Sequence, residues 1–368
     1  MTSTSSLPVA SPSLEFLDHR AAPAGWVRAH GISGEAAELL ATSDAIDLHL
    51  DSFIWHRIFG YDLAKRHGRG PLGARFLSQC DFPRALEGGL TGATWIITTN
   101  PWRTARGRRD AFVRNIARLR EVFAANAEHF RVVRNARDYR EARAAGQHGA
   151  FVGIQGGNAL DESLDALDLI PDDLVLRITL VHLTSSRIGV TSSPLKLRGG
   201  GLSTFGKDYV RRLDEKRIFV DLAHVNREGF FDAVAVHDPS LPLIVTHTGV
   251  SGVYPHWRNL DDEQLRAVAN TGGTIGVMYQ ASFLGKGKAG RSADAVLRHL
   301  AHIVDTVGED HASLGSDWDG AIVAPPDIAT CLEQPVLVQK MLERGWSPER
   351  IQKILAGNFL RSVAHLRG

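Results

Sequence analysis

The stretch DAIDLHLD at residues 44–51 decides the fold class. It is a short apolar run that ends in His49 and Asp51 and has acidic residues at both ends. Such a run is typical of a buried parallel strand. Seven further runs share this character: TGATWIIT (91–98), GAFVGIQ (149–155), LVLRITLVH (174–182), RIFVDLAH (217–224), PLIVTHT (242–248), GGTIGVMY (272–279) and HASLGSD (311–317).

Longer amphipathic stretches separate these runs, with apolar residues three and four positions apart as in surface helices. Eight strands alternating with helices predict a closed (β/α)8 barrel, the TIM barrel of the α/β class, although an open α/β sheet would give a similar pattern. The clearest predicted helices cover residues 104–130, 205–217, 262–271 and 292–308.

The chain length of 368 residues fits one elaborated barrel. We predict a flexible tail over residues 1–20, which are rich in Ser, Thr and Pro, and a single domain over residues 21–368.

Composition restricts the partners. The formal net charge of +1 gives no reason to expect nucleic acid or an anionic membrane as a partner. We see neither a secretory signal nor a membrane span, so we expect a cytoplasmic protein. Cys80 and Cys331 are far apart in sequence and are expected to be inert thiols rather than a disulfide framework.

Polar side chains stand at the ends of several predicted strands. The carboxyl ends of barrel strands meet at one mouth, where active sites are built. Residues two apart on a strand face the same side, so His49 and Asp51 can reach one ion. A lone histidine is weak evidence, but several imidazoles and carboxylates together suit Zn²⁺, Mn²⁺ or Fe²⁺. The candidates are His49, Asp51, Gln155, His182, His224, His247 and Asp317.

These motifs give the sequence a family resemblance. Residues 44–360 resemble the renal (membrane) dipeptidases, metallopeptidases of the amidohydrolase superfamily. The resemblance rests on IDLHLDSFIW, CDFPRALEGGLTGATW (80–95), GLSTFGKDYVRRLDEKRIFVDLAHV (201–225), PLIVTHTGV (242–250), HWRNLDDEQLRAV (256–268) and LGSDWDG (314–320), in the family's order.

The resemblance implies a metal-dependent barrel that hydrolyses dipeptides, with zinc as the expected metal and one or two ions bound. His49 and Asp51 would bind one ion, and His224 and His247 the second. The family is often dimeric, which makes a homodimer the implied assembly.

Three residues receive substrate or proton-transfer roles from the same resemblance. Arg258 would bind the substrate carboxylate through its planar fork of donors. His182 would contact the scissile carbonyl, and Asp317 would carry the proton from water to the leaving amine. Two simpler alternatives remain: Arg258 could pair with Asp261 or Asp262 on the surface, and Asp317 could cap a helix or turn.

The sequence departs from the family at strand three, which reads VGIQGGNAL. The family has a glutamate that bridges both metals where this chain has Gln155, and it usually has a histidine at Asn158. An amide can offer one oxygen, but it cannot share a negative charge between two ions. Gln155 is therefore expected to be a weak or non-ligating residue that weakens at least one metal site.

Three hypotheses follow. The first is a metal-dependent hydrolase of small amide substrates that carry a free carboxylate, dipeptide-like in size. The second is a repurposed lyase, isomerase or transferase of a biosynthetic pathway, with a mononuclear metal site. The third is a binding protein without catalysis, because a fold alone does not fix function.

Overall fold

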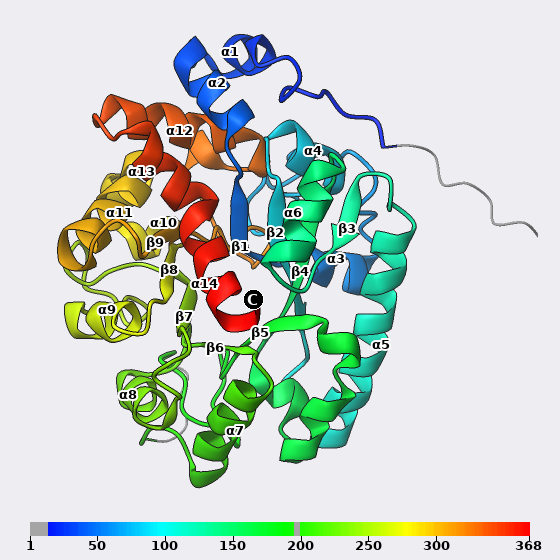
Figure 1. The fold of residues 1–368 in the computed structure, drawn as a ribbon, viewed down its shortest axis with the longest axis vertical. Helices are drawn as coiled ribbons and strands as arrows, with labels where there is room; N and C mark the ends of the chain where they lie inside the picture. Colours follow the sequence, from blue (N-terminus) through cyan, green and yellow to red (C-terminus); the bar gives the residue numbers. More distant parts are fainter. Residues whose placement is uncertain (1–13, 195–198) are drawn as a thin grey trace, which may run out of the picture.

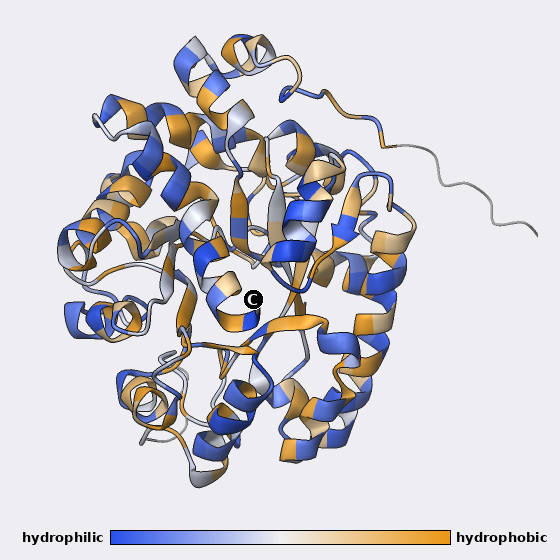
Figure 2. Ribbon diagram, in the orientation of Figure 1, coloured by the Kyte–Doolittle hydropathy of each residue, from blue (hydrophilic) through white to orange (hydrophobic). Residues whose placement is uncertain are grey.

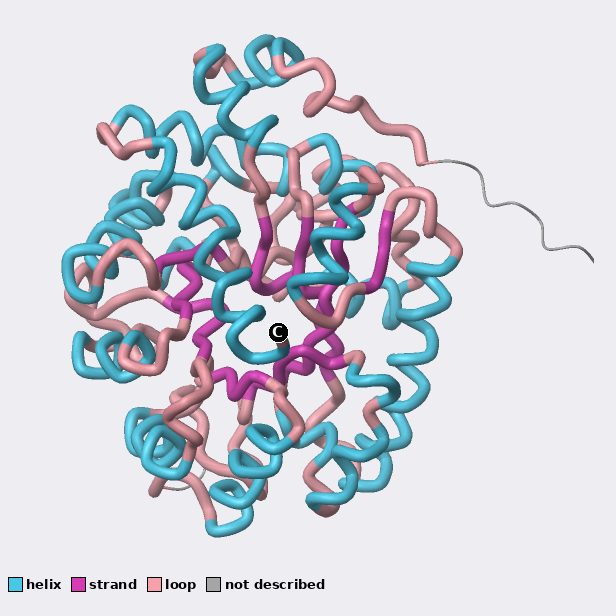
Figure 3. Tube along the Cα trace, in the orientation of Figure 1, coloured by secondary structure: helices cyan, strands magenta, loops and turns pink. Residues whose placement is uncertain are grey.

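The computed structural model describes residues 14–194 and 199–368, which form a barrel of parallel strands with helices outside it (Figures 1 and 3). Eight strands run in the order β1-β2-β4-β5-β6-β7-β8-β9. A parallel bridge between Leu50 and Trp318 joins the last strand's end to the first. The backbone amide of Asp51 also donates to the Trp318 carbonyl at 3.0 Å. The predicted (β/α)8 barrel is confirmed.

The strands are short and buried along their length, apart from β3, which pairs only with β4 at the barrel's edge. Their bounds are β1 Ile46–Leu50, β2 Gly92–Thr98, β3 Phe130–Val132, β4 His148–Gln155, β5 Val175–Thr179, β6 Phe219–Asp221, β7 Ile244–Thr248, β8 Thr274–Val277 and β9 Ala312–Leu314.

The helices pack their apolar faces on the strands, and Figure 2 shows hydrophobic and hydrophilic residues alternating around them. They are α1 Ala24–His30, α2 Gly34–Thr42, α3 Ser52–Phe59, α4 Phe82–Glu87, α5 Ala105–Ala124, α6 Ala136–Ala144, α7 Thr204–Glu215, α8 Arg227–Val236, α9 Asp262–Ala269, α10 Ala281–Leu284, α11 Ala293–Val307, α12 Gln334–Glu343, α13 Pro348–Gln352 and α14 Asn358–Arg367.

Helix α14 covers the amino-terminal end of the barrel (Figure 1). Its residues Phe359 and Val363 belong to a buried cluster that contains early strand residues such as Ile46 and Phe219. The hydroxyls of Ser362 and Thr274 also lie 2.8 Å apart. This end is therefore filled by buried apolar side chains, which leaves the carboxyl ends of the strands to build a site.

Several predicted boundaries were wrong. Strands predicted to end at His182 and His224 stop at Thr179 and Asp221, because the chain leaves the sheet three residues before each histidine. The predicted helix 104–130 ends at Ala124, and Phe130 already starts β3. The helical periodicity of α5 hid this short edge strand, which lacks an alternating pattern of its own.

The predicted tail over residues 1–20 lies mostly outside the described residues. Of its described part, Leu14 is buried and the Leu17 amide donates to Glu87 at 3.2 Å. Cys80 and Cys331 are free and buried, as expected of inert thiols. Across residues 14–194 and 199–368, no helix combines the length and apolar character that crossing a bilayer requires.

Candidate metal centre

The predicted site residues converge at the carboxyl ends of the strands. A cavity of about 340 Å³ opens there, and its wall includes six of them: Asp51, Gln155, His182, His224, Arg258 and Asp317. His49 and His247 are fully buried beside it. A volume of this size is within the range of small-molecule sites.

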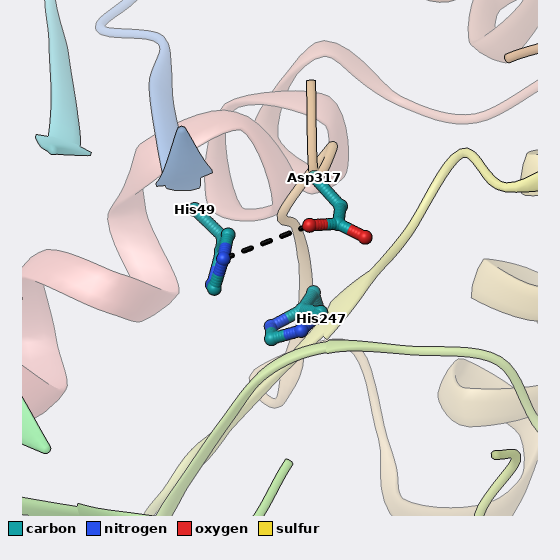
Figure 4. Close-up of side chains that lie close together, drawn as sticks. All are labelled: His49, His247 and Asp317. Carbon is teal, nitrogen blue, oxygen red and sulfur yellow. Dashed lines mark ion pairs between the residues drawn. The ribbon is translucent and has the colours of Figure 1, made fainter. Parts of the chain in front are cut away.

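Both predicted ligand pairs come together. The Nε2 atom of His49 lies 3.3 Å from Asp51 Oδ2, and the Nε2 atoms of His224 and His247 are 2.9 Å apart. Asp317 joins them, with Oδ1 3.6 Å from His49 Nε2 (Figure 4). Donor atoms of His49, His247 and Asp317 all lie within 4.8 Å of one another. Imidazole nitrogen and carboxylate oxygen are the donors that zinc prefers.

Burial sets the charge state of these groups. It is the largest of the causes that hold the pKa of His49, His224 and His247 well below the usual range, so the three imidazoles are neutral, as metal ligation requires. Burial also raises the pKa of Asp51 to about 6 and that of Asp317 well above its usual value, the latter helped by the nearby Asp51 charge.

Backbone strain marks the same positions. His224 and Asp317 adopt left-handed conformations, with φ of 66° and 64°. Such conformations cost of order 1 kcal/mol or more for residues other than glycine, and they gather at functional sites. In both residues the side chain lies in the wall of the cavity, just beyond the end of a strand.

Gln155 occupies the end of β4, between the metal-ligand candidates. Its Nε2 lies 3.2 Å from His224 Nε2 and 3.4 Å from His247 Nε2, while its Oε1 is buried without a partner. Asp51 Oδ1 is likewise buried and unpartnered. Unsatisfied buried oxygens beside neutral imidazoles fit a divalent cation. The donor set therefore suits a metal ion, with Gln155 able to contribute only a neutral oxygen.

Arg258 lies in the cavity wall and does not pair with the surface aspartates considered above. Asp261 contacts Arg227 at 2.7 Å, and Asp262 contacts His302 at 2.7 Å. The Arg258 Nη2 donates to the His247 carbonyl at 2.7 Å, and its Nε has no partner. Burial lowers the pKa of Arg258 to about 10, which leaves it charged at neutral pH.

His182, Asp317 and the neighbouring Asp319, which was not a predicted site residue, have different surroundings. His182 lines the cavity, and burial lowers the pKa of its imidazole to about 4. Asp319 accepts from Ser52 Oγ and from the backbone amides of Gln79 and Cys80, so its carboxylate holds loops together. Asp317 faces His49 instead of capping a helix.

Sequence reasoning missed a polar floor beneath the site. Asp221 Oδ2 accepts from Arg177, Thr179 and Thr246, at 2.9, 2.6 and 2.8 Å. Arg177 is fully buried and also donates to His49 Nδ1 at 2.7 Å. The available signal was a charged residue inside the apolar run LVLRITLVH, because arginine is almost never fully buried without a partner.

It also missed the apolar part of the cavity wall, which comes from loops after several strands and from helices α3 and α10. The Trp257 and Phe283 rings contact edge to face, 5.5 Å apart. Other apolar lining residues are Ile54, Trp55, Leu183, Met278 and Ile322.

The fold and the centre together define a metallohydrolase barrel of the dipeptidase type. The profile of the membrane dipeptidase family (peptidase family M19) matches residues 34–366. The chain therefore belongs to the membrane dipeptidase family, and it is a metallo-dipeptidase-like hydrolase.

Individual relatives agree with this membership. A solved metallopeptidase described as dipeptidase AC is 26% identical, covers 88% of this chain and 99% of its own, and has a TM-score of 0.75. A metallopeptidase from Rhodobacter sphaeroides, solved with a phosphinate mimic of the dipeptide L-Ala-D-Ala, is 25% identical with the same coverages and TM-score. The probable dipeptidase PvdM from Pseudomonas aeruginosa, 18% identical with a TM-score of 0.80 over 90% of this chain and 98% of its own, shares the fold.

A curated relative is an uncharacterised protein of the pqqA 5′ region in Klebsiella pneumoniae. It is 31% identical over 171 residues, which are 46% of this chain and 62% of that protein's length. This chain thus matches less than two thirds of that relative.

Proposed function

We propose that the chain is a metal-dependent hydrolase of small, dipeptide-like amides that carry a free carboxylate. The observation that carries this proposal is the place of Arg258. Its charged guanidinium, whose Nε has no partner, lines the same cavity as His182, His224 and the aspartates of the centre. A guanidinium recognises a carboxylate through two parallel hydrogen bonds. The R. sphaeroides relative's dipeptide mimic supports a substrate of this size.

The candidate metal ligands are the pair of His49 and Asp51 and the pair of His224 and His247, and one or both pairs would hold an ion, with Gln155 contributing weakly or not at all. Zinc is the leading candidate. A bound divalent ion supplies a Lewis acid for the amide carbonyl and lowers the pKa of water.

The chain's own groups would do the rest. Arg258 holds the substrate carboxylate and so fixes the position of the scissile bond. The neutral His182 imidazole can donate a hydrogen bond to the carbonyl oxygen as negative charge develops there. Asp317, whose pKa is raised by burial, can take a proton from water and deliver it to the leaving nitrogen.

The test is turnover of a panel of L,L and L,D dipeptides by purified protein with Zn²⁺ or Mn²⁺. We expect hydrolysis that stops on chelation and returns on adding metal. Absence of turnover across the panel, with metal bound, would sink the proposal.

A second candidate is a repurposed lyase, isomerase or transferase, and Gln155 is the observation that favours it. Without a bridging carboxylate, the centre is less suited to activating water. Efficient hydrolysis of the dipeptide panel by the native protein would exclude this candidate.

A cytoplasmic location and a homodimer stay predictions. Light scattering during size-exclusion chromatography distinguishes a dimer of about twice 40.1 kDa from a monomer.

A further inference from the structure

Arg177 stands at an unusual place for a charged side chain. It lies on β5 inside the barrel and is 0% exposed. Its Nη1 donates to Asp221 Oδ2 at 2.9 Å and to Thr179 Oγ1 at 2.6 Å. A Cβ atom at Gly153, on the neighbouring β4, would lie only 2.8 Å from Arg177 Nε. The glycine therefore leaves the space that the guanidinium fills.

The other end of the guanidinium determines which ring nitrogen of His49 carries the hydrogen. Arg177 Nη2 lies 2.7 Å from His49 Nδ1. Arginine has donors only, so His49 Nδ1 must supply the lone pair, and the neutral ring then carries its hydrogen on Nε2. That Nε2 faces Asp51 Oδ2 at 3.3 Å and Asp317 Oδ1 at 3.6 Å. His49 thus presents an N–H to the carboxylates at the atom through which it would bind a metal.

The same polar residues beneath the site favour the opposite tautomer of His247, with the hydrogen on Nδ1. The Thr246 hydroxyl donates to Asp221 Oδ2 at 2.8 Å, so its oxygen accepts from His247 Nδ1 at 2.9 Å. His247 Nε2 therefore keeps its lone pair, 2.9 Å from His224 Nε2. Two nitrogens on one tetrahedral zinc lie roughly 3.3 Å apart, given Zn–N bonds of about 2.05 Å. His224 and His247 need little movement to share an ion.

We infer that Arg177 confines the centre to a single ion, held through His224 and His247, and leaves His49 and Asp51 as a hydrogen-bonded pair. This inference rests on the proposed function only in taking the centre to bind metal. Gln155 and Arg177 are then two independent obstacles to a second ion. Restoring the bridging carboxylate removes the first obstacle and leaves the second.

The experiment is a zinc count by elemental mass spectrometry on the full chain, after loading with zinc and desalting. Three proteins are compared: native, Gln155→Glu, and Gln155→Glu with Arg177→Met and Asp221→Asn. Asp221 changes with Arg177 because a lone buried carboxylate would be strongly destabilising. We expect one, one and two ions per chain.

A matched control uses a different buried pair. Arg84 and Asp81 are buried and lie 2.7 Å apart, on α4 and its N-cap. Arg84→Met with Asp81→Asn, in the Gln155→Glu background, should leave the count at one. Circular dichroism verifies that each variant is folded.

The outcomes separate the two proposals. Two ions in the native protein or in Gln155→Glu overturn the inference and leave the hydrolase proposal standing. If the native protein binds no ion, both the single-ion inference and the metal dependence of the proposed hydrolase are overturned. One ion in the folded triple variant shows that Arg177 does not limit the count.

A second measurement needs no variant of Arg177. The ¹⁵N shifts of the histidine rings in chelator-treated protein, assigned with His49→Gln, report which ring nitrogen carries hydrogen. We expect hydrogen on Nε2 of His49. Hydrogen on Nδ1 would overturn the inference even where the triple variant fails to fold.

Discussion

Replacing Arg258 with methionine tests the substrate proposal most directly. The change keeps much of the side chain's apolar volume and removes the charge and the donors. It also removes the 2.7 Å bond to the His247 carbonyl. Truncating one partner of a buried, hydrogen-bonded charge pair costs about 2–5 kcal/mol. Taking about 3 kcal/mol, and 1.4 kcal/mol for each tenfold change, the kcat/KM of a dipeptide should fall roughly 150-fold.

The discriminating assay compares each dipeptide with its C-terminal carboxamide. Native protein should prefer the free acid by about the same factor, because the amide offers no negative charge to Arg258. Arg258→Met should reduce that preference to about threefold or less, since both substrates then lack an anchor. Affinity for a phosphinate dipeptide mimic, measured by calorimetry, should fall in parallel.

The control is Arg227→Ala, which removes an exposed arginine paired with Asp261 and Glu263. Exposed pairs contribute about 1 kcal/mol or less, so acid preference and stability should hardly change. The reasoning about Arg258 is refuted if Arg258→Met remains folded and still prefers the acid as strongly as the native protein does.

Three further predictions concern the cavity wall and the barrel. Trp257→Ala should raise KM about tenfold for dipeptides with leucine or phenylalanine but little for Ala-Ala, because about 1–2 kcal/mol of apolar contact is lost; equal effects on both would contradict this. Gly153→Ala should lower the free energy of unfolding in urea by about 1–3 kcal/mol, since the new Cβ would meet Arg177 Nε at 2.8 Å. Burial lowers the pKa of His148 to about 3, so only the unfolded state takes up its proton below about pH 6.5. Its contribution to stability should therefore fall by about 2–3 kcal/mol by pH 4.5, and His148→Gln should flatten that dependence.

The sequence was sufficient to predict the barrel and the groups at its mouth. Apolar runs ending in polar residues identified His49, Asp51, His224 and His247, and the structure brings these four together. The reason is geometric: every strand of a parallel barrel delivers its carboxyl end to the same place. This holds for His49, Asp51 and His247, which lie on a strand or directly after one, whereas His224 reaches the site three residues beyond β6, through a left-handed backbone.

The floor and the apolar wall could not be predicted in this way. Arg177 contacts His49 across 128 residues of sequence, and Gly153 on a third strand leaves room for its guanidinium. Trp257 belongs to a loop and Phe283 to the short helix α10, and the positions of both depend on tertiary packing. Local periodicity shows which side of a helix or strand is buried. It does not show which residues of other elements pack against that side, so it carries no information on such contacts.

The balance of forces in the pocket favours a working centre over an abandoned one. Arg258 keeps a buried, unpartnered Nε, Asp51 keeps an unpartnered Oδ1, and His224 and Asp317 hold left-handed backbones. Each of these features lowers the stability of the fold. Substitution by apolar side chains of similar volume often stabilises buried charged sites. A pocket with no ligand would therefore gain stability by losing them. The presence of all four beside the neutral Gln155 supports the proposal that this centre still binds a metal ion and a substrate.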